Sequence, residues 1–230
     1  MSKVDTKIKE VDGYSLSFDS EWTSHLESKE HWGFYWVQAW LVHELTKPED
    51  RLLEIGVGTG FLSNYLRARG RAVVTVDIDG DKSPDIVSDA SSYDFSAEKF
   101  AAILAFEVFE HMPFPLFKRT VQNISFQKPA SFLFSIPWSV RSIGSIKLKF
   151  PKTPVVEARV DIPKKKIFTK NHFWELKKRG NAAPEVLDGS VKGLVSIKDV
   201  LAVFEEQDYS VEPVHREGRI QFFKASRNDG

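Results

Sequence analysis

The sequence contains no cysteine, so it can hold neither a disulfide framework nor a site built on thiolate ligands or a cysteine nucleophile. Its six histidines do not follow the H-E-x-x-H pattern or another ligand spacing, and the sequence therefore predicts no metal site. No apolar run approaches the ~20 residues of a membrane span, and the polar N-terminus lacks the apolar core of a signal peptide. These absences predict a cytoplasmic protein without a membrane-spanning segment.

An excess of charge of either sign is also missing, because 32 basic residues balance 32 acidic ones. A net charge of zero argues against attraction of the whole molecule to nucleic acid or to an anionic membrane, although it leaves room for a local patch. The hydrophobic fraction of 42% is ordinary for a globular protein, and 230 residues suit one domain with an elaboration.

What the sequence does contain is a glycine-rich turn between a strand and a helix. Residues 52–55 form a short apolar run of the length of a buried strand, and Gly56, Gly58 and Gly60 follow at alternate positions. A helical pattern of apolar residues then begins at Phe61. Glycine permits positive φ and close approach of a ligand, and the new helix offers unpaired N–H groups beside the turn.

The spacing of these glycines separates three kinds of site. A dinucleotide site requires G-x-G-x-x-G, but Phe61 stands where the third glycine would be, which disfavours a nicotinamide-dependent oxidoreductase. A phosphate loop requires Gly-Lys-Ser or Gly-Lys-Thr, which the chain lacks. The pattern that fits is E-x-G-x-G-x-G, which starts at Glu54.

An acidic residue follows the next predicted strand at the distance expected for ribose recognition. Asp77 ends the apolar run 72–76 and lies 21 residues after Gly56, where a carboxylate can accept hydrogen bonds from ribose hydroxyls. Asp79 competes for this role, and an ordinary Asp-Gly turn is the alternative explanation. We favour Asp77 because it follows the strand directly.

Together with the later segments Glu107-Val108-Phe109-Glu110-His111 and Ser135-Ile136-Pro137, the glycine pattern resembles class I S-adenosylmethionine-dependent methyltransferases of the small-molecule type. The resemblance covers residues 52–138, and it departs from the family at Ala101, where aspartate is usual. It implies a Rossmann-like, doubly wound α/β fold. The expected sheet has seven mostly parallel strands, an antiparallel last strand and helices on both faces.

The resemblance also implies S-adenosylmethionine as cofactor and S-adenosylhomocysteine as product. An acidic residue after the third strand would accept a hydrogen bond from the adenine amino group, and the next backbone N–H would face the ring. Glu54 and Glu107 would hold the amino group and the ribose. The residues expected to bind the cofactor are Glu54, Gly56, Gly58, Gly60, Asp77, Ile78, Asp89, Ala90, Phe106 and Glu107.

Segments outside this core are expected to serve the methyl acceptor. We expect one domain with an N-terminal helical cap (1–46), a cofactor-binding core (47–138), a substrate-side insertion (139–196), and a C-terminal helix with closing strands (197–230). Residues 31–35 could cover a ligand, although core packing is the simpler explanation of their aromatic rings. Residues 147–179 hold eleven basic and three acidic residues, which indicates either a solvated face or a surface for an anionic acceptor.

The chemistry of the acceptor cannot be read from the sequence. An oxygen or carbon acceptor needs a base, and His111, His172 and Glu175 are the candidates, although His111 is better explained as a structural residue of a strand-to-helix turn. The acceptor is expected to be a small molecule, with RNA or protein as alternatives. A module that binds the cofactor without catalysis is a further alternative, because a fold does not fix a function.

Overall fold

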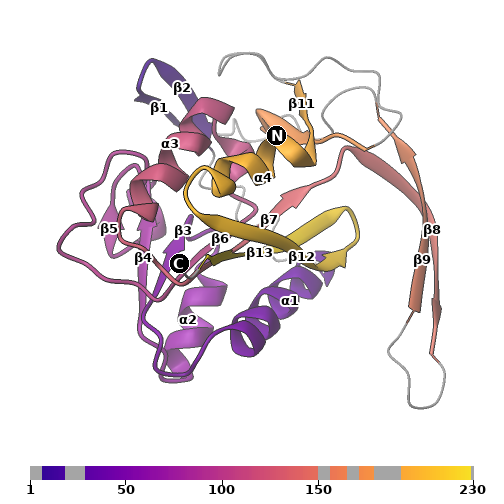
Figure 1. Cartoon of the computed structure of the whole chain (residues 1–230), viewed down its shortest axis with the longest axis horizontal. Helices are drawn as coiled ribbons and strands as arrows, with labels where there is room; N and C mark the ends of the chain where they lie inside the picture. The colour runs from indigo at the N-terminus through magenta and orange to yellow at the C-terminus, as the bar shows by residue number, and fades with distance from the viewer. Residues whose placement is uncertain (1–6, 19–28, 150–155, 165–170, 179–192, 229–230) are drawn as a thin grey trace, which may run out of the picture.

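The computed structural model describes residues 7–18, 29–149, 156–164, 171–178 and 193–228. A seven-stranded sheet of order β12-β13-β7-β6-β3-β4-β5 forms its centre (Figure 1). The five strands from β7 to β5 are parallel, and β13, the last in the chain, is antiparallel to both neighbours. The strands are β3 (Leu52–Ile55), β4 (Val73–Asp77), β5 (Ile86–Val87), β6 (Ala102–Phe106), β7 (Ser131–Pro137), β12 (Tyr209–Glu217) and β13 (Ile220–Arg227).

Alternate side chains of the central strands feed two separate cores, because successive residues of a strand point to opposite faces. Leu53 packs with one buried cluster together with α3 and α4, whereas Leu52 packs with another together with α1 and α2. The two helix pairs therefore cover opposite faces of the sheet, as Figure 1 shows. The helices are α1 (Lys29–Leu45), α2 (Phe61–Ala68), α3 (Phe114–Ser125) and α4 (Ile197–Glu205). This arrangement confirms the predicted fold class.

Local signals in the sequence explain how two of these helices begin. Gly60 adopts φ 72° and caps α2, which then presents Leu62 and Leu66 to the core. Ser196 caps α4 by accepting a hydrogen bond from the N–H of Asp199, whose side chain reaches back to the backbone of Ser196. This reciprocal pair is a capping box, for which Ser196 followed three residues later by an acidic side chain is the sequence signal.

Some predicted boundaries are wrong. The sequence pattern of residues 84–90 indicates a strand, but β5 has only two residues, because Asp85 accepts hydrogen bonds from the N–H and hydroxyl of Thr75 on β4 instead of continuing the ladder. The pattern of residues 114–128 indicates a helix, but α3 ends at Ser125, and Lys128 adopts φ 53° three residues later. These corrections concern element ends and leave the order of elements unchanged.

In the described ranges, three smaller strand pairs lie outside the central sheet. Strands β1 (Lys7–Val11) and β2 (Tyr14–Phe18) form a hairpin within the segment predicted as a helical cap. Strands β8 (Val140–Leu148) and β9 (Val156–Pro163) form a long hairpin that projects from the body in Figure 1. Strands β10 (Trp174–Leu176) and β11 (Gly193–Val195) pair in parallel beside β7. The sequence pattern of residues 155–162 indicates the strand β9, but no comparable pattern indicates its partner β8.

Two short 3-10 helices, η2 (Gly80–Lys82) and η3 (Phe109–His111), follow the carboxyl ends of β4 and β6. Both therefore lie at the edge of the sheet where ligands bind in doubly wound folds. None of the helices in the described ranges is long and apolar enough to cross a membrane.

Candidate active site

A cavity of about 790 Å³ opens at the carboxyl ends of β3, β4 and β6. Its size falls in the range of small-molecule and cofactor sites. Nine of the ten residues expected to bind the cofactor line this cavity, and Gly60 is the exception. The structure thus gathers residues that the sequence spreads over 54 positions, from Glu54 to Glu107.

The glycine turn forms the floor of the cavity, and its three glycines have different roles. Gly56 has φ 77°, and a Cβ there would meet Cγ2 of Val108 at 2.6 Å, so a side chain is excluded by the protein itself. Gly58 has φ 56°, and a Cβ there would meet no protein atom within 4 Å. Gly60 caps α2 and lies outside the cavity lining. Only Gly58 combines an open environment with a place on the cavity wall.

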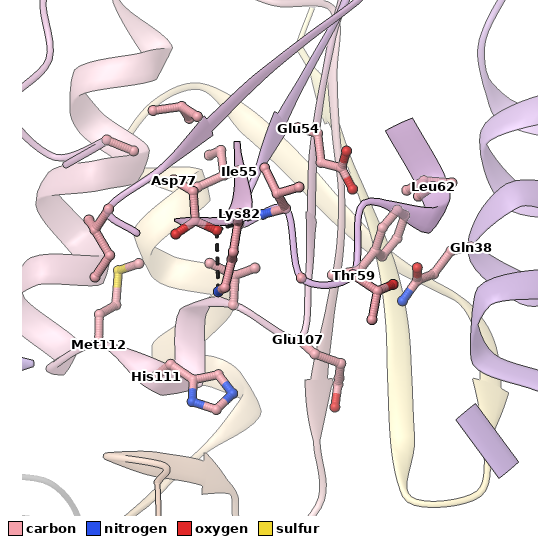
Figure 2. Close-up of a pocket in the computed structure, with 18 of the residues that line it drawn as sticks. Gln38, Glu54, Ile55, Thr59, Leu62, Asp77, Lys82, Glu107, His111 and Met112 are labelled. Carbon is pink, nitrogen blue, oxygen red and sulfur yellow. Dashed lines mark hydrogen bonds and ion pairs between the residues drawn. The ribbon is translucent and has the colours of Figure 1, made fainter. Parts of the chain in front are cut away.

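Asp77 ties the end of β4 to this turn. Its carboxylate accepts hydrogen bonds from the N–H of Val57 at 2.8 Å and of Asp79 at 2.9 Å, and Nζ of Lys82 lies 3.5 Å away (Figure 2). Asp79 is also buried, but its side chain caps η2 and it does not line the cavity. Of the two competing aspartates, Asp77 is the one exposed to a ligand in the cavity.

Glu54 is a buried carboxyl group with an unused acceptor. It lies on β3, on the opposite side of the glycine turn from His111 in Figure 2, and it is 5% exposed. Burial raises its pKa to about 8, against the opposing effects of a Ser63 hydrogen bond and the Arg67 charge. Its Oε2 atom has no hydrogen-bond partner in the described part of the chain. A buried orphan acceptor at a cavity wall suits a cationic ligand group.

The turn after β5 supplies the next side of the cavity. Asp89 accepts hydrogen bonds from the N–H and the hydroxyl of Ser91, so it shapes its own turn while lining the cavity. Ala90 and Ile78 line the same side. Asp89 can therefore shape its own turn and face a ligand in the cavity at the same time.

Glu107 lies in a strained backbone conformation at the end of β6. Its φ of 56° is uncommon for a residue other than glycine and recurs at functional sites. The Ser135 hydroxyl on β7 accepts from its N–H at 2.9 Å and donates to its carboxylate at 2.9 Å. Burial raises the pKa of Glu107 to about 7, although the Ser135 hydrogen bond and the Arg219 charge oppose the rise. Ser135 thus holds a carboxyl group at the junction of two strands.

An aromatic wall from α1 closes one side of the cavity. Tyr35 stacks on Phe61 with 4.9 Å between ring centroids, and its hydroxyl lies 3.2 Å from Oγ1 of Thr59 on the glycine turn. His31 and Phe34 also line the cavity, whereas Trp32 is 51% exposed and lies outside the lining. Core packing was the simpler explanation of residues 31–35, but three of their aromatic rings, His31, Phe34 and Tyr35, line the cavity.

The three residues considered as bases lie close together, two of them on the cavity wall opposite the glycine turn and α1 and the third behind it. His111 at the end of η3 and His172 before β10 line the cavity, with their ring centroids 4.8 Å apart. Nδ1 of His172 lies 2.8 Å from Oε1 of Glu175, which is fully buried behind it and does not line the cavity. The Glu175 carboxylate also lies 3.3 Å from the Arg219 guanidinium on the loop before β13.

Several lining residues were missed by sequence reasoning. Leu16 comes from the β1–β2 hairpin, Gln38 from α1, Lys82 from η2, Asn171 from the insertion and Arg219 from the turn between β12 and β13. None of these belongs to a motif, and their places follow from tertiary packing.

Part of the basic run has structural partners. Lys178 lies 3.0 Å from the carboxylate of Asp161, and Arg159 donates to the carbonyl of Gly218 at 3.0 Å. Burial alone would raise the pKa of Asp161, but hydrogen bonds from Ser142, Lys178 and Arg216 bring it down to about 2. Of the other members, Lys152, Lys165, Lys166, Lys170 and Arg179 lie outside the described residues.

Comparison with known proteins gives a family and a fold. A profile described as a methyltransferase domain matches residues 31–145. Among curated proteins, no sequence matches this chain.

Solved structures resemble the whole domain at low sequence identity. The sugar N-methyltransferase KedS8 from Streptoalloteichus shares 13% identity over 96% of this chain and 97% of its own, with a TM-score of 0.60. The magnesium protoporphyrin IX methyltransferase of Synechocystis, solved with bound S-adenosylmethionine, shares 14% identity over 86% of this chain and 80% of its own, with a TM-score of 0.53.

A glycopeptide N-methyltransferase solved with S-adenosylhomocysteine shares 10% identity over 84% of this chain and 89% of its own, with a TM-score of 0.53. These likenesses establish the fold, and the profile match extends over half of the sequence. The chain therefore belongs to the methyltransferase domain family.

Proposed function

We propose that the protein is a methyltransferase that uses S-adenosylmethionine to methylate a small-molecule acceptor. The observation that carries this proposal is the position of the Glu54 and Asp77 carboxylates on one cavity, with the glycine turn between them. Neighbouring folds that were solved with S-adenosylmethionine and S-adenosylhomocysteine support the choice of cofactor.

The cavity residues fit the groups of this cofactor. Glu54 offers an orphan buried oxygen to the amino group, and Asp77 keeps lone pairs for the ribose hydroxyls beyond those that accept from Val57 and Asp79. The open space beside Gly58 leaves room for the cofactor against the backbone. The side lined by Asp89 and the backbone of Ala90 suits the adenine edge.

The bound cofactor supplies an electrophilic methyl group on a sulfonium. The protein's task is then to position the acceptor in line with that methyl group, which can supply a large part of the rate acceleration. A carboxylate in contact with the sulfonium would stabilise the ground state more than the transition state. We therefore assign Glu54 and Glu107 to the peripheral groups of the cofactor and the faces of Tyr35 and Phe106 to its cationic part.

The acceptor side of the cavity is assigned to the wall that holds His111, Asn171 and His172. Asn171 and His172 belong to the 139–196 segment, which supports the interpretation of that segment as a substrate-side insertion. The basic excess of residues 147–179 favours an anionic acceptor over a neutral one. Solved neighbours act on a porphyrin, a sugar and a glycopeptide, so the fold itself does not select the acceptor.

Titration calorimetry and a methyl-acceptor screen test this function. S-adenosylhomocysteine should bind with one site per chain, whereas NAD should not bind at the same concentrations. Transfer of a labelled methyl group from S-adenosylmethionine to sugars, porphyrins, peptides and short RNA should then identify the acceptor class. Binding of NAD in preference to S-adenosylhomocysteine would overturn the proposal, and cofactor binding without transfer to any acceptor would favour a non-catalytic module.

A further inference from the structure

The two faces of the β8–β9 hairpin differ in chemistry. Successive side chains of a strand point to opposite faces, so Arg159 and Asp161 of β9 share one face. Asp161 pairs with Arg216 of β12 at 2.7 Å, and Arg159 donates a hydrogen bond to the carbonyl of Gly218 at 3.0 Å. This anchored face therefore holds the hairpin to the closing strands of the central sheet.

The opposite face of the hairpin is apolar and open to solvent. Gly144 of β8 pairs with Val160 of β9, and Ile146 pairs with Ala158. Residues that pair across two strands lie on the same face, and residues two positions further along each strand point the same way. Four large side chains of this apolar face keep between 50% and 65% of their surface exposed, namely Ile146, Leu148, Val160 and Ile162.

A contiguous apolar face of this size indicates a binding surface. Single exposed apolar side chains are common on proteins, but a group that exposes several hundred Å² together marks a site of interaction. The hairpin projects from the body in Figure 1, and two strands without further partners are only marginally stable in water. Because the apolar face runs from Ile162 at the base of the hairpin to Leu148 near its tip, a partner can contact its whole length.

The charges of the hairpin favour a protein partner over a lipid surface. Within the described part of the apolar face, Arg141, which pairs with Ile162 at the base, is the one charged residue. A surface that binds anionic lipids carries basic side chains beside its apolar ones, whereas Arg159 lies on the anchored face. The core of a protein–protein interface, in contrast, is depleted of charge.

We propose that the apolar face of the hairpin is a dimer interface, on which the same face of a second copy of this chain packs around a two-fold axis. A face with almost no charge does not repel its own copy, and two-fold contacts of this kind are the commonest in soluble oligomers. Two hairpins stacked in this way would lie about 10 Å apart, like the sheets of a sandwich. They would bury roughly 1,000 Å² in total, which is the size at which specific interfaces begin.

Small residues at the centre of the apolar face leave room for side chains of the second copy. A Cβ at Gly144 would meet no atom within 4 Å, and the small side chain of Ala158 lies across from Ile146. Large and small residues therefore alternate across the two strands, because Gly144 itself lies across from Val160. The two-fold axis would place large side chains of one copy over small positions of the other. This packing does not depend on the proposed methyl transfer.

Sedimentation equilibrium on the tag-free protein tests the interface. In the micromolar range the parent should approach twice the chain mass of 26.2 kDa. Ile146→Lys combined with Val160→Lys should weaken association by more than about 100-fold, because like charges from both copies would meet in a desolvated interface. Phe126→Lys is the matched control, since it removes a side chain that is 76% exposed at the end of α3, and it should leave association unchanged.

Far-UV circular dichroism shows whether each variant is folded. Cross-linking gives a second test that needs no disruptive change, because the chain has no cysteine and a bifunctional thiol reagent joins only an introduced one. Ile146→Cys should yield a covalent dimer at low micromolar protein, whereas Phe126→Cys should not.

Three outcomes would overturn the proposal. The first is a monomeric parent at about 100 µM, well above the range expected for an interface of this size. The second is full association of the folded double variant, or no covalent dimer of Ile146→Cys. The third is a monomeric parent that sediments with vesicles of phosphatidylcholine and phosphatidylglycerol, which would assign the apolar face to a lipid surface instead.

Discussion

The Asp77 carboxylate accepts a hydrogen bond from the N–H of Val57 at 2.8 Å, which joins the end of β4 to the glycine turn that follows β3. Asp77 thereby fixes the conformation of the turn as well as facing the cavity. A variant at this position changes two properties at once, the stability of the turn and the affinity for a ligand. Asp79 allows these two effects to be separated, because it is also buried and accepts a backbone hydrogen bond but does not line the cavity.

We predict that Asp77→Ala weakens S-adenosylhomocysteine binding by about 10–100-fold, because charge-assisted hydrogen bonds worth roughly 1.5–3 kcal/mol each would be partly replaced by water. Calorimetry on the purified variant measures this loss. Asp79→Ala is the matched control, since Asp79 is also buried and accepts a backbone N–H, from Asp81 at 3.2 Å, but does not line the cavity. A large loss for Asp79→Ala with none for Asp77→Ala would show that the wrong aspartate has been assigned to the ribose.

Gly58→Val is predicted to abolish S-adenosylhomocysteine binding while the protein still folds. A Cβ at this position meets no protein atom within 4 Å, so the new side chain would occupy space that the cofactor needs. The φ of 56° adds backbone strain of about 1–2 kcal/mol, which a thermal melt should detect as a lower Tm. Calorimetry then measures the loss of binding.

Gly70→Val controls for that strain. Gly70 has φ 80°, and a Cβ there also meets no atom within 4 Å, but the residue follows α2 and does not line the cavity. We expect a similar decrease in Tm with full affinity for S-adenosylhomocysteine. Equal affinities in the two folded variants would remove Gly58 from the cofactor site.

The order of elements and one side of the site could be predicted because their signals are local. The glycines at 56, 58 and 60, and the acidic residues Asp77 and Asp89, each follow a recognisable apolar run, and parallel strands bring such positions to one edge. Gly60 is the one expected cofactor-binding residue that does not line the cavity. It matches the motif equally well, but it caps α2. A sequence pattern does not distinguish a glycine that faces a ligand from one that starts a helix.

The wall lined by His111, Asn171 and His172 was less predictable because it depends on contacts between distant segments. Arg219 reaches Glu175 across 44 positions of sequence. The β1–β2 hairpin contributes Leu16 to the cavity and packs on Leu116, yet the sequence analysis assigned this segment to a helical cap. These contacts follow from packing, which composition and periodicity do not encode.

Binding of S-adenosylhomocysteine is predicted to strengthen as pH rises from 6 to 8. Burial keeps Glu54 protonated up to a pKa of about 8, and only the ionised carboxylate pairs with the ammonium group of the ligand. Affinity should therefore increase by up to roughly tenfold per pH unit below 8. Calorimetry across this range measures the slope, and Glu54→Gln should remove it. A pH-independent affinity in the parent protein would contradict the assignment of Glu54 to the amino group.

The same carboxyl group is predicted to make the ligand-free protein less stable as pH rises. In the unfolded chain Glu54 loses its proton near the ordinary value of 4.5, whereas in the folded protein it keeps the proton to about pH 8. The folded state thus binds more protons between these values, and the free energy of unfolding falls across that window. Urea denaturation at pH 5 and pH 8 should show that Glu54→Gln gains a few kcal/mol over the parent at the higher pH.

Asp161 is predicted to stabilise the attachment of the β8–β9 hairpin to the closing strands. It lies on β9 and pairs with Arg216 of β12 at 2.7 Å and with Lys178 at 3.0 Å, and its side chain is only 1% exposed. Its pKa of about 2 lies below the ordinary value of 3.8, so the folded protein favours the ionised form. The corresponding stability is present above about pH 4 and is lost as pH falls toward 2.

Asp161→Asn should therefore lower the free energy of unfolding by about 1–2 kcal/mol at pH 7, a value reduced for the partial exposure of both cationic partners. The difference between parent and variant should shrink as the pH of the denaturation series approaches 2. S-adenosylhomocysteine affinity should stay within a few-fold of the parent, because Asp161 does not line the cavity. A difference in stability that persists unchanged at pH 2 would mean that packing around the side chain, rather than its charge, secures the hairpin.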